Sequence, residues 1–197
     1  RAPKDWPGYR VFGWFPPGQQ WQADLVSLGD EAIASSKFLL SVIDIGSRYV
    51  LLIPLSNKTS ETVAKAFNQL MEEFYTAYPQ HKPSTTAVVH TDSGNEFLGK
   101  QFQAMLQQRN MRHIEASGVH GSPIIERAHR SLKELARFAQ ISRESLQKLS
   151  YANVLTKHAL PAYNQRKHSY FKNKFSPLTA LAADTDTLAS LVLKHHP

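Results

Sequence analysis

The spacing of apolar residues changes several times along the chain, and each stretch of constant spacing predicts one element. Short apolar-rich runs bounded by turn residues are typical of buried or half-buried strands. They occur at residues 21–28, 38–45, 49–55, 85–91 and 111–115. Apolar residues three and four positions apart instead mark one face of a helix. They occur at residues 59–78, 99–109, 123–139 and 143–165.

The ends of the predicted helices carry residues that begin, bend or stop a helix. Thr59 or Ser60 can cap the first helix, and a proline directly after it ends it. Ser122 is a good N-cap for the third helix, because Pro123 then takes the first helical position, where its missing N–H costs nothing. Pro161 predicts a bend in the fourth helix. The capping residues and prolines therefore support the helix ends predicted from the apolar spacing.

The elements come in the order of three strands, a helix, and then alternating strands and helices. Three consecutive strands predict an antiparallel meander, and the alternation after them predicts helices on both faces of the sheet. We therefore expect an α/β fold, a mixed five-stranded sheet flanked by helices, with a core at residues 21–180. Residues 1–20 are expected to form an arm or linker whose aromatic side chains pack on that core. Residues 181–197 are expected to form a helical tail.

Composition narrows the classes of function. The chain has 197 residues and is 42% hydrophobic, which suits one well-packed domain. No apolar run approaches the roughly 20 residues of a membrane span and no signal peptide opens the chain, so no membrane partner is expected. The chain has no cysteine, which excludes disulfides, cysteine-ligated zinc and thiol catalysis within it. A formal net charge of +7 makes nucleic acid a candidate partner, bound through its phosphates.

Three carboxylates occupy chemically useful places. In the stretch VVHTDSGNEF, Asp92 stands at the tip of the fourth predicted strand; Asp24 lies in the first strand, 68 residues earlier, and Glu126 opens the third helix, 34 residues later. If strands one and four are neighbours, these groups converge, and their repulsion requires a compensating cation. Oxygen-only ligands suit Mg²⁺, and two such ions can serve phosphodiester chemistry. The simpler interpretation of the same stretch is a solvated turn, because Asp, Ser, Gly and Asn favour turns.

A basic stripe follows Glu126 on its helix. Arg130, Lys133 and Arg137 lie four, seven and eleven positions further on and share one helix face with it. A carboxylate at the head of a cationic stripe suits a metal site from which a DNA backbone runs outward. The alternative is an exposed helix face with an ordinary Glu–Arg pair.

Other polar residues are assigned to structure. Asp30, Asp44, Glu96 and Glu115 could also be chosen as acidic ligands, but they lack the same local context. Asp44 precedes a glycine turn that it can cap, and Glu96 can order the loop after Asp92. Three further residues are expected to pack or hydrogen-bond within the core: Trp21, His90 and His113.

Taken in order, these segments resemble the D,D,E catalytic core of retroviral and LTR-retrotransposon integrases, to which Polinton-type integrases and DDE transposases are also similar. The resemblance covers residues 20–180 and rests on WQADLVSL, VIDIGSRYVLLIPLSNKT, VVHTDSGNEF, GSPIIERAHRSLKE and YNQRKHSYFKNKFSPLTAL. It implies a ribonuclease-H-like fold and makes Asp24, Asp92 and Glu126 the catalytic ligands of two Mg²⁺ ions, which Mn²⁺ can replace. It also implies two reactions, hydrolysis near a DNA 3′ end and joining of that end to target DNA.

The resemblance extends to DNA contacts and partners. Arg130 and Lys133 match positions that hold the element's DNA end, Asn95 matches a position near target DNA, and residues 117–122 match a mobile catalytic loop. Two more residues complete the set expected to contact DNA, Arg137 and Ser122. The implied partners are double-stranded DNA (element ends and target) and a second copy of the chain or a larger assembly, with a host chromatin tether left open. The implied location is the nucleus.

Two departures from the family pattern shape the expectation. Asp92 and Glu126 have 33 residues between them, where a longer interval is common, so the loop at 117–122 is expected to be trimmed. The family's zinc-binding N-terminal domain needs cysteine ligands. We therefore expect either an excised core or an element without that domain.

Three functions remain open from the sequence. The favoured one is a DNA strand-transferase core. A ribonuclease-H-like nuclease is the second, although such sites usually carry a fourth carboxylate and lack the basic helix that follows Glu126. The third is a host-domesticated, integrase-derived binding protein without activity, for which an intact set of three carboxylates is not needed.

Overall fold

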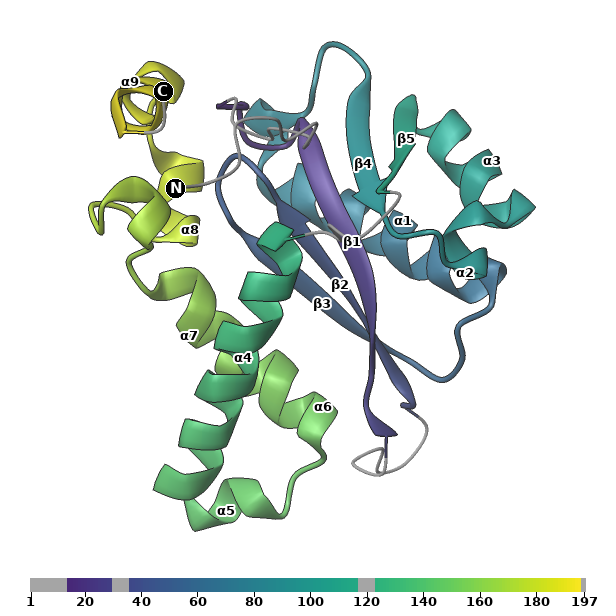
Figure 1. Cartoon of the computed structure of the whole chain (residues 1–197), viewed down its shortest axis with the longest axis vertical. Coiled ribbons are helices and arrows are strands. Elements are labelled where there is room, and N and C mark those ends of the chain that lie inside the picture. Colours follow the sequence, from purple (N-terminus) through teal and green to yellow (C-terminus); the bar gives the residue numbers. More distant parts are fainter. Residues whose placement is uncertain (1–13, 30–35, 117–122, 196–197) are drawn as a thin grey trace, which may run out of the picture.

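The computed structural model describes residues 14–29, 36–116 and 123–195 and has an α/β architecture (Figure 1). Five strands form one mixed sheet in the order β3-β2-β1-β4-β5. The strands are β1 Gln20–Ser27, β2 Phe38–Asp44, β3 Val50–Leu55, β4 Ala87–Thr91 and β5 Met111–Glu115. The five predicted strands and the mixed sheet are therefore confirmed.

β1 occupies the centre of the sheet and fixes the positions of its neighbours. It pairs antiparallel with β2 and parallel with β4, where Gln22 lies opposite His90. Gln22 and His90 each stand two residues before an aspartate, so the parallel register brings Asp24 and Asp92 to the same level of adjacent strands. The condition for their convergence, that strands one and four are neighbours, is met.

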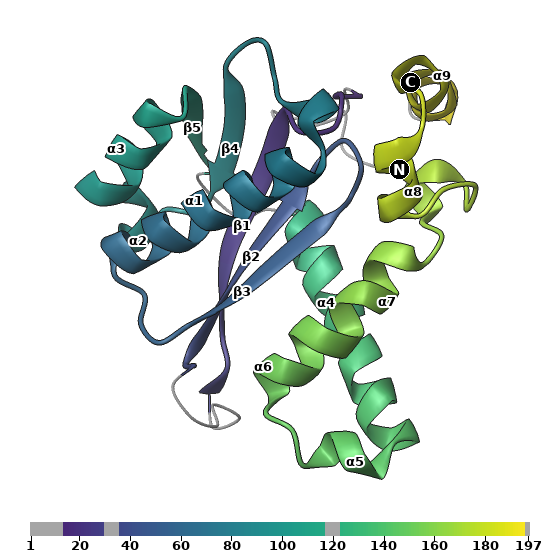
Figure 2. The ribbon, with the colours of Figure 1, turned by 180° about the vertical axis from the view of Figure 1, so that it is seen from behind.

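Three helices cover one face of the sheet, with α1 running across the strands in Figure 2. They are α1 Ser60–Ala77, α2 Asn95–Leu98 and α3 Lys100–Gln108, and a short 3-10 turn at Pro79–His81 follows α1. The side chain of Thr59 caps α1, as expected, by accepting from the backbone N–H of Thr62. Trp21 is fully buried in the core under α1 and meets the ring of Phe74 edge-on at 4.8 Å, so its structural assignment is confirmed.

The sequence suggested a turn and loop after β4, but the structure has a helix there, because α2 begins at Asn95. Phe97 is fully buried, with its ring 5.2 Å from that of Phe102. Its backbone N–H donates to the carbonyl of Gly94 at 2.9 Å. Burial of this ring draws the chain into a helical turn, and the first residues of that turn are therefore held by the core.

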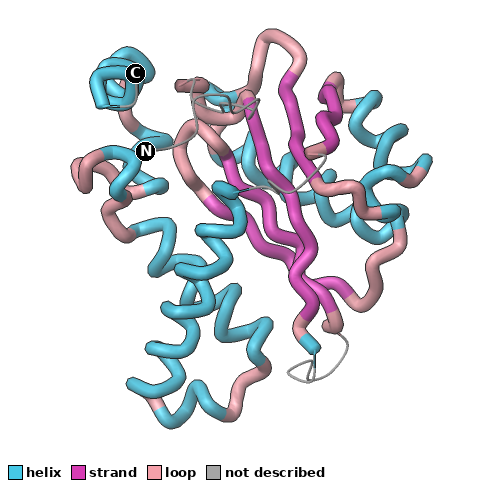
Figure 3. Tube along the Cα trace, in the orientation of Figure 1, coloured by secondary structure: helices cyan, strands magenta, loops and turns pink. Residues whose placement is uncertain are grey.

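The second face of the sheet is covered by helices from the C-terminal half of the chain. They are among the cyan tubes to the left of the magenta strands in Figure 3. This second helix layer consists of α4 Pro123–Ser142, α5 Glu144–Gln147, α6 Tyr151–Val154, a π-helical turn Leu155–Ala159 and α7 Leu160–Gln165. Apolar side chains of α4, α6 and α7 form one cluster with Leu39, Ile43 and Val50 of the sheet. The expectation of helices on both faces is confirmed.

The single helix predicted for residues 143–165 is wrong. After α5 a new helix starts at Ser150, whose side chain accepts from Asn153 N at 3.3 Å. Helical structure then continues to Gln165, but the turn before Pro161 widens to the π type. Proline lacks an N–H and its ring crowds the carbonyl four residues earlier, so a wider turn relieves the clash. The irregularity expected at Pro161 is this turn, whereas the break at Ser150 was not expected.

The C-terminal part forms a third, smaller layer. A 3-10 turn at Ser169–Phe171 leads to α8 Pro177–Ala182 and α9 Thr185–His195, so the expected short helical pieces are present. Trp14 packs on the apolar cluster of this layer, whose buried members are Phe171, Ala180, Leu188 and Val192. Of the other aromatic residues of the arm, Phe15 is half-buried, and Trp6, Tyr9 and Phe12 lie outside the described residues. Within the described ranges, no helix combines the length and apolar character that crossing a membrane requires.

Asn164 on α7 joins the second helix layer to the edge of the sheet. Its Oδ1 accepts from Val50 N at 3.0 Å, and its Nδ2 donates to Val50 O at 2.9 Å. β3 is an edge strand, so the side chain supplies hydrogen bonds that a further strand would otherwise make.

Replacing Asn164 by Ala leaves both main-chain polar groups of the fully buried Val50 without partners. We expect the free energy of unfolding to fall by about 2–6 kcal/mol, because each of the two unpaired buried groups costs about 1–3 kcal/mol. Urea denaturation measures this. The control Asn68→Ala removes an exposed acceptor of Arg109 and should cost less than about 1 kcal/mol. Equal losses in the two variants would contradict the role assigned to Asn164.

Candidate active site

Asp24 lies within β1 on the sheet face that α4 covers. Its side chain is 30% exposed. One carboxylate oxygen, Oδ1, accepts from the backbone N–H of Leu25 at 2.8 Å. The other, Oδ2, lies 3.7 Å from Nδ1 of His129 on α4. The strand thus presents one oxygen toward the helix while its own backbone holds the other.

Asp92 directly follows the last residue of β4 and is exposed. Its Oδ1 accepts from Gly94 N at 3.1 Å, which is the turn that the simpler interpretation predicted. The two residues before Asp92 are held in the sheet. His90 Nε2 lies 3.3 Å from Gln20 Oε1 on β1, and Thr91 is fully buried. The turn and the strand end together fix the carboxylate at the edge of the core.

Glu126 stands in the first turn of α4 and is exposed. The start of this helix is tied to β1 by a buried hydrogen bond, in which Ile125 N donates to Gln22 Oε1 at 3.0 Å. Gln22 is 3% exposed and lies two residues before Asp24, on the same side of the strand. Sequence reasoning missed Gln22, although its place in the strand alternation beside Asp24 was a usable signal.

The charges of these groups act on one another. The pKa of Asp24 is raised from 3.8 to about 6, first by burial, then by the negative charge of Asp92, with smaller contributions from Glu126 and Glu96; the Leu25 N–H opposes this. Like charges in a partly buried site disfavour ionisation. The three predicted ligands are therefore close enough to repel.

The donor set suits a hard divalent cation. All three side chains offer carboxylate oxygens, and a cation would relieve the repulsion that raises the pKa of Asp24. Among the residues with described placement, no three or more His, Asp or Glu side chains gather closely enough to hold one metal ion. The set of Asp24, Asp92 and Glu126 as metal ligands therefore stays a prediction.

Glu96 lies nearer to the site than its assignment as a loop-ordering residue implied. A Cβ added at Gly94 would meet both the Glu96 carboxyl carbon, at 2.9 Å, and Asp92 Oδ1, at 3.0 Å. Gly94 therefore leaves room for two neighbouring carboxylates that a larger residue would displace. The charge of Glu96 also contributes to the raised pKa of Asp24.

His129 is a second residue that sequence reasoning missed. It lies three positions after Glu126, one helical turn on, which was the available signal. The 3.7 Å separation from Asp24 is short enough for an ion pair, yet burial and then the charge of Lys133 lower the pKa of His129 to about 4. Its buried Nε2 has no partner among the described residues. We therefore assign a neutral imidazole beside Asp24 at neutral pH.

Known proteins share this architecture. Residues 16–116, just over half of the chain, match the family described as "Integrase core domain". The chain belongs to the integrase core domain family. The Pol polyprotein of transposon 412 from Drosophila melanogaster is 30% identical over 93 residues, which is 46% of this chain and 7% of that polyprotein. The chain thus corresponds to a small part of this relative.

Solved structures agree on the fold. The integrase catalytic core of HTLV-2, in complex with magnesium and in a trimeric form, has a TM-score of 0.63 at 20% identity, covering 85% of this chain and 98% of that one. The catalytic core of BIV integrase has a TM-score of 0.61 at 17% identity, covering 84% and 94%. At these identities the likeness shows the fold alone. The expected resemblance to integrase cores and the ribonuclease-H-like fold are confirmed.

The predicted DNA-contacting residues of the integrase core are all exposed where the structure describes them. Arg130, Lys133 and Arg137 share one side of α4, and Asn95 begins α2. Ser122 and the loop at 117–122 lie outside the described residues. Their DNA contacts stay predictions.

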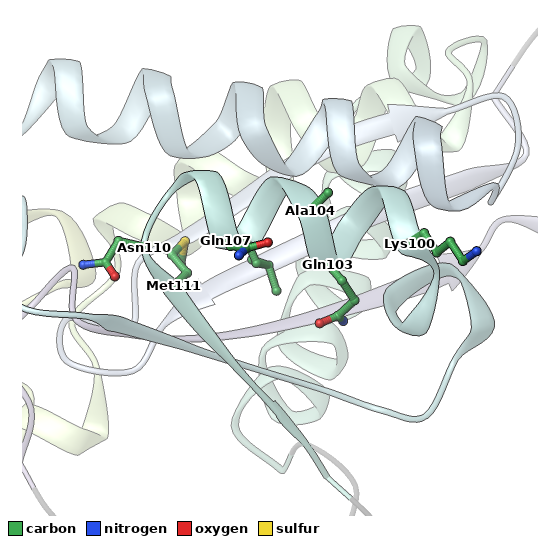
Figure 4. Close-up of a pocket in the computed structure, with 7 residues that line it drawn as sticks. Lys100, Gln103, Ala104, Gln107, Asn110 and Met111 are labelled. Atoms are coloured by element: carbon green, nitrogen blue, oxygen red, sulfur yellow. The ribbon is translucent and has the colours of Figure 1, made fainter.

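A shallow hollow of about 580 Å³ lies on the outer side of α3 and is a poor candidate for the site (Figure 4). Its lining combines Lys100 with the amides Gln103, Gln107 and Asn110 and with apolar residues, and it includes no carboxylate. Gln103 already donates to Phe97 O and contacts His113 Nδ1 at 2.8 Å. His113 also lies 2.8 Å from Thr91 Oγ1, which confirms its hydrogen-bonding role.

Replacing Asp24 by Asn tests the electrostatics of the site. The folded-state pKa of about 6 exceeds the unfolded value of 3.8, so ionisation of Asp24 destabilises the native protein progressively from about pH 4 to pH 6. In EDTA, the variant should therefore be more stable than the parent at pH 7, by about 1–2 kcal/mol after allowance for solvent screening, and unchanged at pH 4. Denaturant unfolding at both pH values measures this.

Glu73→Gln is the matched control, because Glu73 is an exposed carboxylate on α1 whose replacement keeps its hydrogen bond with Gln69. Its effect should be small at both pH values. If Asp24→Asn changes the free energy of unfolding equally at pH 4 and pH 7, ionisation of Asp24 does not destabilise the folded protein and the prediction is wrong.

Proposed function

We propose that this integrase core catalyses metal-dependent processing of DNA 3′ ends and joins those ends to target DNA. Membership of the integrase core family supports a polynucleotidyl transferase of the integrase type. The observation that carries the finer proposal is the electrostatic coupling of Asp24 to Asp92 and Glu126 at the head of a basic helix. Carboxylates that repel one another beside a phosphate-binding surface suit phosphodiester chemistry with a divalent cation.

Asp24, Asp92 and Glu126 would hold Mg²⁺, or Mn²⁺ in its place. Bound there, the ion would supply charge stabilisation for the attacking and leaving oxygens. The chain itself orients the ligands: the backbone of Leu25 fixes one oxygen of Asp24, and the Gly94 turn fixes one oxygen of Asp92. His129, as a neutral ring 3.7 Å from the second oxygen of Asp24, would limit the access of water to that oxygen.

The basic side of α4 would bind the DNA backbone. Arg130, Lys133 and Arg137 are exposed and follow Glu126 along one helix side, so phosphates bound to them lead toward the carboxylates. Asn95, held by α2, would contact target DNA from the other side. Ser122 would join these contacts through the loop before α4.

Two displacement reactions at phosphorus make up the proposed activity. In the first, a water oxygen forms a bond to a phosphorus near the DNA 3′ end, and the bond from that phosphorus to the 3′ oxygen of the retained strand breaks. The terminal nucleotides leave with a 5′-phosphate, and the retained strand ends in a 3′-hydroxyl. In the second, the new 3′-hydroxyl oxygen attacks a target phosphodiester and releases one target-strand 3′ end. Neither reaction needs a covalent enzyme intermediate, so no serine or tyrosine nucleophile is required.

The proposed reaction also has consequences for the oligomeric state of the protein and for its location in the cell. Joining two ends of one element to one target requires two sites held together, which implies a dimer or a larger assembly. Chromosomal target DNA implies action in the nucleus.

Glu96 supports a second candidate, a nuclease of the same fold. Its carboxylate gives the site a fourth acidic group beside Asp92, and nucleases of this fold usually carry a fourth carboxylate. Cleavage of an RNA–DNA hybrid without any joined product would favour this candidate over strand transfer.

Glu126→Gln should abolish DNA joining. The change removes one negative ligand and keeps the shape of the side chain, so joining in Mg²⁺ or Mn²⁺ should fall about a thousandfold or more, equivalent to several kcal/mol of lost stabilisation. The assay uses matching DNA ends and also a branched DNA that reports the reverse reaction. Circular dichroism should show an unchanged fold.

Glu144→Gln makes the same chemical change on the exposed first turn of α5 and serves as the control. It should join DNA like the parent. A Glu126→Gln variant that joins or reverses strands as well as the parent would remove Glu126 from the site.

Lys133→Glu should weaken binding of a DNA end. Loss of one phosphate contact lowers the slope of log affinity against log salt concentration by about 1. Fluorescence anisotropy at several salt concentrations measures both quantities. The control Lys65→Glu reverses an exposed charge on α1, across the sheet from α4. If both variants weaken binding equally, the effect is that of net charge and Lys133 has no specific contact.

A further inference from the structure

A second, deeper cavity lies on the other side of α4 from the basic stripe. Its volume is about 700 Å³, and it opens between α4 and the segment from the end of α7 to the 3-10 turn at Ser169–Phe171. α4 and α7 lie side by side there (Figures 1 and 2). We call it the Arg48 cavity, after the most buried cation in its wall. Its other basic and aromatic lining residues are Trp14, Arg127, Tyr163, Arg166, Lys167, His168 and Tyr170.

Two buried donors in this wall have no hydrogen-bond partner. Nη1 of Arg48 and Nε1 of Trp14 are two of only four such buried side-chain atoms in the described ranges. Arg48 is 8% exposed and its guanidinium lies 3.8 Å from the ring centre of Tyr170. A buried guanidinium N–H without an acceptor is costly, because charged groups lose more on leaving water than neutral ones. Two such donors lining one cavity point to a missing acceptor.

Nearby carboxylates do not supply that acceptor. Asp44 is the acidic group whose charge acts on Arg48, but its oxygens already accept from Gly18 N at 2.8 Å, from Ser47 N at 2.7 Å and from the Ser47 hydroxyl. This also confirms its predicted turn-capping role. Glu134 also lines the cavity, but its side chain is exposed. The buried guanidinium in the wall of the cavity therefore has its charge only partly balanced.

The remaining cations strengthen the positive potential. Arg127 comes from α4, whereas Arg166 and Lys167 follow α7, so the cavity is basic on two sides. Burial, followed by the charges of Arg48, Arg127 and Arg166, lowers the pKa of His168 to about 4. The ring stays neutral at pH 7, and the guanidinium groups remain as charged donors.

We propose that the Arg48 cavity binds a phosphate group. Guanidinium forks match phosphate oxygens, and a phosphate accepts from several donors at once. The exposed Arg127 and Arg166 provide such donors, and the buried N–H groups of Arg48 and Trp14 in the same wall would join them once their side chains turn toward the bound group. The aromatic walls leave room for an organic body attached to it. The phosphate can be free, part of a small phosphomonoester or the end of a nucleic-acid strand. None of the predicted metal ligands lines this cavity, and the proposal is independent of DNA joining.

The test titrates the 197-residue chain at constant ionic strength by calorimetry with three probes. They are inorganic phosphate, a nucleoside 5′-monophosphate, and a short single strand with either a 5′-phosphate or a 5′-hydroxyl. Arg48→Gln and Arg127→Gln each remove one charged donor and should weaken phosphate binding about tenfold or more. Arg127 is exposed, so its variant keeps the test valid even if Arg48→Gln fails to fold.

Arg143→Gln is the control, because it removes the same charge from an exposed residue just beyond α4, outside the cavity lining. It should bind phosphate like the parent. Binding of only the 5′-phosphorylated strand identifies a strand end as the source, and binding of all the phosphorylated probes shows that the group alone suffices. No binding by the parent, or equal binding by the parent and both cavity variants, overturns the proposal.

Discussion

The hydrogen bond from Ile125 N to Gln22 Oε1 ties the central strand to the helix that carries Glu126. Both partners are buried. If the bond breaks, one N–H group of the first helical turn and the amide oxygen of Gln22 therefore lose their partner and have no access to water. Gln22 and Asp24 share one side of β1, and Ile125 directly precedes Glu126. The geometry between two of the predicted ligands is therefore set by a contact that neither ligand makes.

The same region holds groups that do not stabilise the fold. Asp24 ionises against the charge of its neighbours, and His129 keeps a buried nitrogen without a partner among the described residues. Both are tolerated because the surrounding apolar clusters and the β1 pairings are extensive. Such local cost on a stable scaffold is typical of sites under functional constraint. This is a stronger argument for a site than the number of acidic residues in the sequence.

The sequence predicts what depends on local periodicity. Strand and helix spacing predicted the five strands, whereas the adjacency of β1 and β4, and hence of Asp24 and Asp92, was only a condition, which the structure meets. It could not predict contacts that cross between elements, such as the pairing of Gln22 with α4 or the approach of His129 to Asp24. Nor could it locate the helix break at Ser150, because a cap residue inside an amphipathic stretch is read as part of one helix.

α4 packs on the sheet along one seam, and two further sides of the helix, its flanks, lie away from that seam. The seam consists of Ile125, Ala128, Leu132 and Ala136. One flank carries Arg130 and Lys133 below Glu126, and the other carries Arg127 in the wall of the Arg48 cavity. Across a helix about 10 Å wide, two unit charges interact by only about 0.4 kcal/mol in water, and salt screens this further. A phosphate in the cavity would therefore change DNA binding on the opposite flank little by charge alone. A larger coupling between the two flanks would have to arise from a shift of α4 itself, which the Gln22 contact opposes.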